Sequence, residues 1–362
     1  MEQQKFNRRD FLKYTGMLAG AMMLPRNTRL LPQANSPYPA GARLGRICQG
    51  DIGAPTEIKG EPNMASPTVG MIMRDEVVQL KQEVIATEVD LLRFRQRWTE
   101  TDQGFIYSDY IHPVKYILNE PLVQLPTAEN GQPGLWVQMS VPVTDFELTQ
   151  YPAASYWIRE YAVPKLYYGQ NFWAIDLRQK DGRTQYLLTQ KYGALPDKFW
   201  VDAVYCRPIS AEELTPLSPD VRDKKMIIRM HDQSLSCYEN GKEIFYTEIS
   251  GGLQRADGTW LTPMGQHLVW RKMVSLHMSA GGMSAFDAPG ISWTTLFDSN
   301  GAAIHYAYWH NSFGSPYSHG CINCTLEDAH WLWRWCSPPV DYYPGEFTVA
   351  TGANSTLIEV VA

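Results

Sequence analysis

Short segments of strand character, separated by turn residues, constrain the fold of this chain more than any other feature. Residues 77–84 alternate apolar and polar side chains, which is the period of a strand with one buried face. Asp181-Gly182 and Asn240-Gly241 each separate two such segments, and both dipeptides are typical of two-residue hairpin turns. Residues 104–114 predict a further strand. The chain is therefore predicted to be mainly β.

The length and the linkers predict several domains. A chain of 362 residues is longer than one hydrophobic core usually serves. Proline-containing linkers lie at 25–42 and 207–219. We therefore divide the chain into a signal and linker, a β-barrel domain, a second β-rich region, a domain that carries the chemistry and a C-terminal tail, with bounds 1–42, 43–116, 117–220, 221–351 and 352–362.

Composition excludes some classes of protein. Hydrophobic residues make up 44% of the chain, which is typical of a folded globular protein. The net charge is -6 and no long basic run follows the N-terminus, so we expect no nucleic acid partner. No later segment is long and apolar enough to predict a transmembrane helix.

The N-terminus resembles a twin-arginine export signal. Arg8 and Arg9 precede Phe11, Leu12 and Lys13, and a short apolar segment follows at 14–24. Such signals carry folded proteins across the bacterial membrane. The resemblance implies an extracytoplasmic protein that the twin-arginine machinery exports, located at the cell wall or held to the membrane by an uncleaved anchor. The alternative is a basic helix that only touches the membrane.

Cys321 is the candidate nucleophile. It follows Gly320, which permits a tight turn, and it lies two residues after His319; His305 ends an apolar run sixteen residues upstream. A thiol and an imidazole suffice for acyl transfer through a thioester, because the imidazole takes and returns the proton. We expect the backbone N–H groups of Gly320 and Cys321 to form an oxyanion hole. His310 is the alternative base, interpreted as a loop residue at the rim.

A short helix is predicted directly after this cysteine. Thr325 is a suitable N-cap, acidic residues follow in the first turn, and Pro338-Pro339 ends the helix. The N-terminus of a helix carries a partial positive charge. We therefore expect the pKa of Cys321 to be lowered from its ordinary value of about 8.5.

The run Ser318-His319-Gly320-Cys321-Ile322-Asn323 resembles the active-site motif of the L,D-transpeptidases, the YkuD-like family of cell-wall cross-linking enzymes. The resemblance extends over the last third of the chain and implies a catalytic β-sandwich with a short helix after the nucleophile. Trp98 and residues 104–114 resemble bacterial SH3-like modules, which often bind cell-wall peptides. The fold implied is thus a catalytic β-sandwich preceded by SH3-like β-barrel modules.

This family resemblance implies roles for individual residues. Cys321 would attack the third residue of a stem tetrapeptide and release D-alanine, and His305, oriented by the backbone carbonyl of residue 306, would be the base. His319 and Gly320 would complete the catalytic loop, and no metal or organic cofactor would be needed. The residues expected to line the groove or to contact the substrate are Ser318, Asn323, Trp309, Trp293, His277 and Tyr306, the last in a position where the family usually has a small residue.

The same resemblance implies the partners. The donor and the acceptor would be peptidoglycan stem peptides, with an acceptor amine resolving the thioester. Carbapenem-type β-lactams would acylate Cys321, because their strained carbonyl mimics the donor amide. Two alternatives stay open: an L,D-carboxypeptidase, in which water resolves the thioester, and a non-catalytic wall-binding protein, in which the SH3-like region carries the function.

Overall fold

The computed structural model of the protein is described here for most of the chain after the N-terminal segment. The described residues are 36–49, 55–150, 153, 155, 165–191, 197–280, 286–348 and 354–362. The expected export signal, with Arg8 and Arg9, lies outside them. Among the residues that are described, none of the helices is long and apolar enough to cross a bilayer. The structure is mainly β, as predicted.

The N-terminal β region consists of two antiparallel sheets around a small core of isoleucines, with Ile47, Ile58 and Ile106 fully buried. The strand predicted over 77–84 is two strands that belong to different sheets, and the strand predicted over 104–114 is interrupted by a 3-10 turn at Ser108–Tyr110. The first sheet has the order β4(Val77–Gln79)-β1(Leu44–Ile47)-β8(Ile111–Val114), and the second has the order β3(Thr68–Ile72)-β2(Thr56–Lys59)-β7(Gly104–Tyr107)-β6(Arg97–Thr101)-β5(Glu83–Ile85).

The second β-rich region is built on a six-stranded antiparallel sheet. Its longest hairpin turns at Asp181-Gly182, as predicted, with φ angles of 51° and 76° that match a tight hairpin turn. Phe172, Leu188 and Phe199 form its buried core. The sheet has the order β11(Glu147–Leu148)-β15(Lys198–Asp202)-β14(Arg183–Thr189)-β13(Asn171–Lys180)-β9(Leu135–Met139)-β16(Cys206–Pro208), and β10(Val143–Asp145) pairs separately with β12(Lys165–Tyr167).

The region after residue 221 contains two five-stranded sheets. The hairpin at Asn240-Gly241 forms as predicted, with φ angles of 49° and 77°. The first sheet has the order β19(Lys242–Glu248)-β18(Ser234–Glu239)-β17(Lys224–Arg229)-β26(Leu357–Val361)-β20(Gly265–Leu268), and the second has the order β24(Ile322–Cys324)-β23(Ala303–Tyr306)-β22(Phe286–Leu296)-β21(Arg271–Ala280)-β25(Glu346–Thr348).

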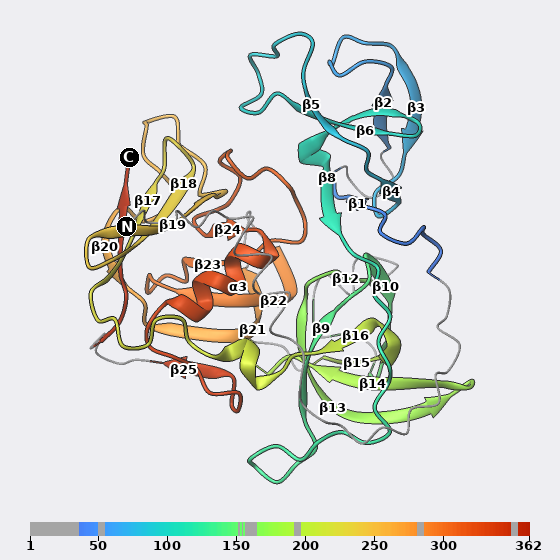
Figure 1. The fold of residues 1–362 in the computed structure, drawn as a ribbon, viewed down its shortest axis with the longest axis vertical. Helices are drawn as coiled ribbons and strands as arrows, with labels where there is room; N and C mark the ends of the chain where they lie inside the picture. Colours follow the sequence, from blue (N-terminus) through green and yellow to red (C-terminus); the bar gives the residue numbers. More distant parts are fainter. Residues whose placement is uncertain are drawn as a thin grey trace, which may run out of the picture. The chain divides into compact units, whose positions relative to one another are not determined.

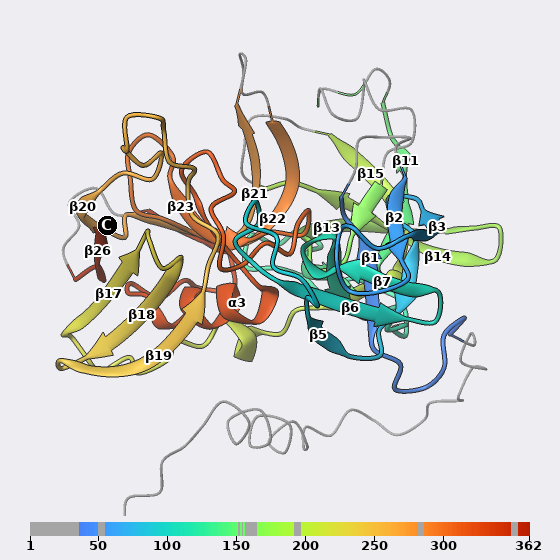
Figure 2. The same cartoon turned by 90° about the horizontal axis from the view of Figure 1, so that it is seen from above.

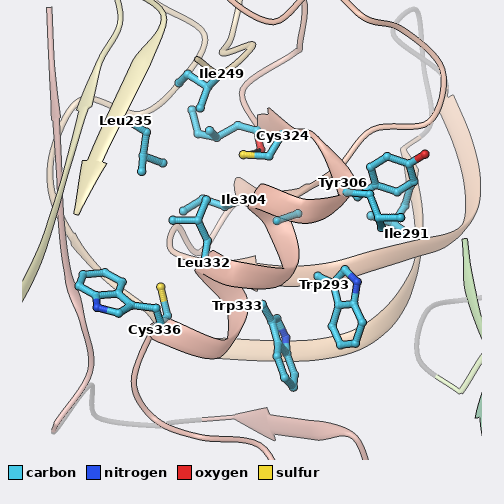
Figure 3. Packing of buried hydrophobic residues seen from close by; sticks show 14 of the residues in the cluster. Leu235, Ile249, Ile291, Trp293, Ile304, Tyr306, Cys324, Leu332, Trp333 and Cys336 are labelled. Atoms are coloured by element: carbon cyan, nitrogen blue, oxygen red, sulfur yellow. Dashed lines mark hydrogen bonds between the residues drawn. The ribbon is translucent and has the colours of Figure 1, made fainter. Parts of the chain in front are cut away.

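The predicted helix is present as α3, Leu326–Trp335, and it packs among the strands of this region (Figures 1 and 2). Thr325 caps it by accepting a hydrogen bond from the backbone N–H of Asp328. Leu332 and Trp333 of the helix belong to one buried cluster with Leu235 on β18 and Ile304 on β23. Figure 3 shows Leu332 and Trp333 on the helix and Leu235 on the neighbouring strand at the left. The helix therefore fills the core between the two sheets.

One expectation about this region is wrong. Residues 352–362 were predicted to be a tail, but β26 lies inside the first sheet, parallel to β17 and antiparallel to β20. Alternating burial along Leu357–Val361 gives it one face in the core, and only a long-range pairing reveals this.

Lys272 is a buried cation in this core. It is 1% exposed, its ammonium donates to the carbonyls of Cys336 and Pro338, and it lies 4.8 Å from the ring centroid of Trp333. Burial lowers its pKa to about 7. The carbonyls solvate the ammonium only in part, so the folded state releases this proton more easily than the unfolded state does.

The free energy of unfolding is therefore expected to rise with pH above about 7, towards the ordinary lysine pKa of 10.5. Over that interval the unfolded chain binds one proton more, and the slope is at most about 1.4 kcal/mol per pH unit. Urea unfolding at several pH values should show this slope in the wild type and lose it in Lys272→Met. The matched variant of an exposed lysine, Lys242→Met, should keep it; an unchanged slope in Lys272→Met would contradict the assignment.

Candidate active site

The parallel pair β23–β24 brings the candidate base and nucleophile together. His305 on β23 is in register with Asn323 on β24, and Ile304 with Ile322. Cys321 directly precedes β24 and so lies opposite Ala303. Because side chains alternate along a strand, Cys321 and His305 share one face of this sheet, with Cα atoms roughly 8 Å apart from the strand and residue spacings. The register thus places the two residues on one face, and a contact between the thiol and the imidazole stays a prediction.

His305, the candidate base, is a buried imidazole held in one orientation. Its Nδ1 atom lies 2.9 Å from the backbone carbonyl of Tyr306, which can only accept, so Nδ1 carries the proton and Nε2 has a free lone pair. Burial lowers the pKa of His305 to about 4, against the opposing effect of this hydrogen bond. The expected anchor, the carbonyl of residue 306, is therefore confirmed. The ring of Trp309 lies 5.8 Å from the imidazole, centroid to centroid.

Cys321 is a half-buried thiol in an apolar environment. It packs against the cluster of Met273, Leu296 and Ala303. Burial raises its pKa to about 11, and the Ala303 backbone opposes this only partly. The expected lowering of the pKa by the helix is thus wrong, because β24 separates Cys321 from the N-terminus of α3. At neutral pH the site holds a thiol and a neutral imidazole, not a thiolate–imidazolium pair.

Ser318 and Gly320 shape the loop before Cys321, the candidate nucleophile. The Ser318 hydroxyl accepts from the backbone N–H of Gly320 over 3.0 Å and donates to the carbonyl of Cys321. The Gly320 N–H is therefore already used, and its expected role as an oxyanion donor is wrong. Gly251 binds the other side of the loop, because its carbonyl accepts from the backbone N–H groups of Tyr317 and Ser318. His319, within the same loop, is exposed.

Gly320 has a backbone conformation that other residues avoid. Its φ is +140°, and a Cβ atom would lie 3.0 Å from the carbonyl oxygen of Leu261. Gly320→Ala is therefore expected to lower the free energy of unfolding by about 1–3 kcal/mol and to displace the loop. Urea unfolding checks this. Gly258→Ala is the matched control, because Gly258 has φ +84° with nothing within 4 Å; equal losses in the two variants would show that the close approach has no effect.

His310 and Asn323 form a buried pair beneath the loop, 2% and 1% exposed. The backbone N–H of Ser312 donates to His310 Nδ1, and burial holds the pKa of His310 well below its usual value. The single ring proton is then on Nε2, which lies 2.8 Å from the amide nitrogen of Asn323. Two donors cannot face each other, so we assign the Asn323 amide in the opposite orientation, in which its oxygen accepts from Nε2. His310 is thus not a rim residue, and Asn323 braces the loop from inside rather than facing the substrate.

Three other expected contact residues lie in the interior. Trp293 is 1% exposed and stacks on His330 at 4.1 Å between ring centroids, so it does not wall a groove. Tyr306 is fully buried. His277 is 3% exposed and pairs through Nε2 with Asp287 on β22. A buried side chain cannot contact a substrate in this state. Ser318 is also buried, at 8% exposed, so from the expected set only the half-buried Trp309 remains.

Comparisons with known proteins agree with the motif. Residues 223–350 match the family model of YkuD, described as the L,D-transpeptidase catalytic domain. The resemblance to the L,D-transpeptidases is thereby confirmed for this part of the chain, whereas the resemblances to an export signal and to SH3-like modules stay predictions. None of the curated proteins matches the chain.

Several solved structures are similar to parts of the chain. A cysteine-to-serine mutant of an Enterococcus faecium L,D-transpeptidase has 20% identity and a TM-score of 0.30, covering 39% of this chain and 50% of that one. A Mycobacterium smegmatis L,D-transpeptidase has 13% identity and a TM-score of 0.30, covering 69% and 95%. Mycobacterium tuberculosis L,D-transpeptidase 3, in complex with a faropenem-derived adduct, has 16% identity and a TM-score of 0.30, covering 52% and 77%. The chain thus spans about half the length of the Enterococcus protein.

Proposed function

We propose that this protein is an L,D-transpeptidase that forms peptidoglycan cross-links through a thioester on Cys321. The observation that carries the proposal is the position of Cys321 on the same face of the β23–β24 pair as His305, whose Nδ1–H is fixed on the Tyr306 carbonyl. This leaves Nε2 as the base on the same face as the thiol. The family match over residues 223–350 supports the same conclusion.

The acylation step follows from the two neutral groups. As Sγ of Cys321 attacks the carbonyl carbon of the third stem-peptide residue, His305 Nε2 takes the thiol proton, so that no free thiolate is required. The C–S bond forms, and the resulting tetrahedral intermediate carries a negative oxygen. It collapses by breaking the bond to D-alanine, whose amine receives the proton from the imidazolium. A thioester and a neutral imidazole remain.

The second step transfers the acyl group. The amine of a neighbouring stem peptide attacks the thioester carbonyl, and His305 Nε2 takes the proton that the amine loses. The C–S bond then breaks, and the proton passes to sulfur, which regenerates the thiol. Every step uses only Cys321 and His305 as proton carriers, so the proposal requires no metal or organic cofactor.

The proposal places this chemistry outside the cytoplasm. Arg8-Arg9 and the apolar segment at 14–24 support export by the twin-arginine machinery, followed by residence at the cell wall or at the membrane. The resemblance of residues 43–116 to SH3-like modules supports a contact with wall peptides. We further propose that carbapenem-type β-lactams acylate Cys321, because their strained carbonyl mimics the donor amide.

Incubating the protein with purified disaccharide-tetrapeptide is the direct test. We expect mass spectrometry to show released D-alanine and a cross-linked dimer, both absent with Cys321→Ala. Tripeptide without any dimer would instead make water the acceptor and the protein an L,D-carboxypeptidase. No product with either protein, together with binding to purified cell walls, would support the wall-binding alternative.

A further inference from the structure

The segment that follows His305 is held by the N-terminal β region, residues 43–116. Three buried or largely buried side chains of that region donate to backbone carbonyls of the segment. The donors are Arg46 on β1, Arg95 just before β6 and His112 on β8, and their respective acceptors are the carbonyls of Tyr308, Asn311 and His310. Backbone carbonyls buried without a donor are costly, so these contacts fix where the segment can lie.

His112 differs from the two arginines because it makes hydrogen bonds to two residues of the segment, Tyr306 and His310. Its Nδ1 atom lies 2.8 Å from the carbonyl of His310, and its Nε2 atom lies 2.8 Å from the hydroxyl of Tyr306. The carbonyl can only accept, so Nδ1 donates. Burial, with Arg46 nearby, lowers the pKa of His112 to about 3, so Nε2 is unprotonated and is an acceptor. The tyrosine hydroxyl has one proton, which Nε2 shares with the carbonyl of Tyr168. The imidazole is 4% exposed and spans residues 306 to 310.

Tyr306 connects this contact to the base. Its backbone carbonyl is the acceptor that orients His305 Nδ1–H, and its side chain lies on the opposite face of β23. Figure 3 shows its hydroxyl pointing away from α3. The hydroxyl lies 2.8 Å from the carbonyl of Tyr168, and the ring leaves no space for a side chain at Gly169, where a Cβ atom would be 2.4 Å from the ring. The tyrosine is thus fixed at its ring and at its hydroxyl.

Arg46 reinforces the same segment between these two points. Its guanidinium is 1% exposed, pairs with Asp75 at 2.8 Å and lies 4.3 Å from the ring centroid of Tyr167. A buried charge is stable only when it is paired and hydrogen-bonded. The Tyr308 carbonyl is one of its partners, so moving this segment would also disturb the ion pair.

We propose that His112 is a positioning residue for the base His305, acting through the hydroxyl of Tyr306 and the carbonyl of His310. The N-terminal β region is then a structural part of the active site and not only a module that tethers the protein. The measurement of peptide turnover rests on the proposed function. The measurement of the imidazole position is independent of that function, because it needs no peptide substrate.

The experiment compares His112→Ala and Tyr306→Phe with wild type and with their double variant. The first removes both contacts, and the second removes only the hydroxyl. His112→Asn is the conservative variant, because its amide nitrogen can still donate to the carbonyl of His310. The matched control is His330→Ala, since His330 is another largely buried histidine that bonds a backbone carbonyl, that of Glu213, and its pKa is likewise lowered by burial.

Two measurements report on the imidazole directly. Nitrogen NMR of labelled histidines should show His305 unprotonated at Nε2 and not titrating between pH 5 and 8 in wild type and in His330→Ala. In His112→Ala and Tyr306→Phe, its pKa should move towards the usual 6.5, because a displaced ring gains contact with water. The burial that lowers the pKa is a larger effect than the hydrogen bond that raises it. The rate of Cys321 alkylation by iodoacetamide at pH 7 should fall by about tenfold or more, as expected for a displaced base.

Peptide turnover provides the third measurement. We expect kcat to fall by about 10- to 100-fold with KM nearly unchanged, because the base is displaced while substrate binding is kept. The double variant should lose little more than either single variant, since both act through one contact, and His112→Asn should recover part of the loss.

The proposal is overturned if His112→Ala and Tyr306→Phe lose stability as His330→Ala does, while His305 titration and Cys321 alkylation stay as in wild type. His112 would then only fill the core. If the NMR and alkylation effects appear in a protein that turns over no stem peptide, the positioning role stands and the proposed function fails.

Discussion

Replacing Cys321 with alanine is expected to abolish acylation by a carbapenem and every cross-linking activity. The thiol is the only group in the proposed mechanism that forms a bond to the acyl carbon, and loss of a nucleophile typically lowers kcat by at least about 10³-fold. Intact-mass spectrometry after carbapenem treatment should show one adduct on the wild-type protein. The variant should show none.

Cys324→Ala is the matched control for this prediction. Cys324 lies three residues away on β24, but its side chain is fully buried on the face towards the core, so its loss should reduce stability slightly and leave the adduct. All six cysteines are free thiols in the structure, so no disulfide prevents any of them from forming an adduct in this comparison. An adduct that survives in Cys321→Ala would mean that another group is acylated.

Replacing His305 with alanine is expected to slow acylation by about 10²- to 10⁴-fold at neutral pH, the range that a general base contributes. The effect should depend on pH. In wild type the thiol has a pKa of about 11 and the imidazole a pKa of about 4, so both reacting groups stay neutral between these values. The acylation rate should therefore be flat from pH 5 to 9 and decline only as pH falls towards 4.

The variant has only thiolate attack available, and the thiolate fraction grows about tenfold per pH unit below the thiol pKa. Its rate should accordingly rise steadily across the same interval in stopped-flow measurements with a carbapenem. His231→Ala, which removes an exposed histidine, should keep the flat wild-type profile. A rising profile in the wild type would indicate attack by a thiolate that forms only as the pH rises, and it would contradict general-base catalysis by neutral His305.

Local signals in the sequence predicted the elements around the site well. The hairpin turns at Asp181-Gly182 and Asn240-Gly241, the cap at Thr325 and the helix before Pro338 each depend on neighbouring residues, and each appears in the structure. The loop before Cys321 is likewise determined locally, by the hydrogen bonds of the Ser318 hydroxyl to the backbone of Gly320 and Cys321. These features were predictable because their energetics are settled within a few residues of chain.

The remainder depends on contacts between distant segments. Nothing near Tyr306 in the sequence indicates that His112, 194 residues away, would bind its hydroxyl, and the burial of Trp293 and Asn323 reflects what packs over them. The sign of the Cys321 pKa shift was wrong for the same reason. A nearby helix is visible in sequence, whereas the apolar residues Met273 and Leu296 around the sulfur are brought there by other strands.

Strand β26 sets the order in which this domain can form. It pairs with β17 in parallel, Lys225 opposite Leu357, and with β20 on its other side. The strands β17 and β20 of the first sheet are therefore not connected until β26, more than a hundred residues after β17, inserts between them. Until then β17 and β20 each present an unpaired edge, which is a template for pairing with another chain. Closing so long a loop is slow relative to forming local hairpins. Self-association during refolding should consequently depend on how quickly this one strand inserts, and a chaperone that shields strand edges would act on that intermediate.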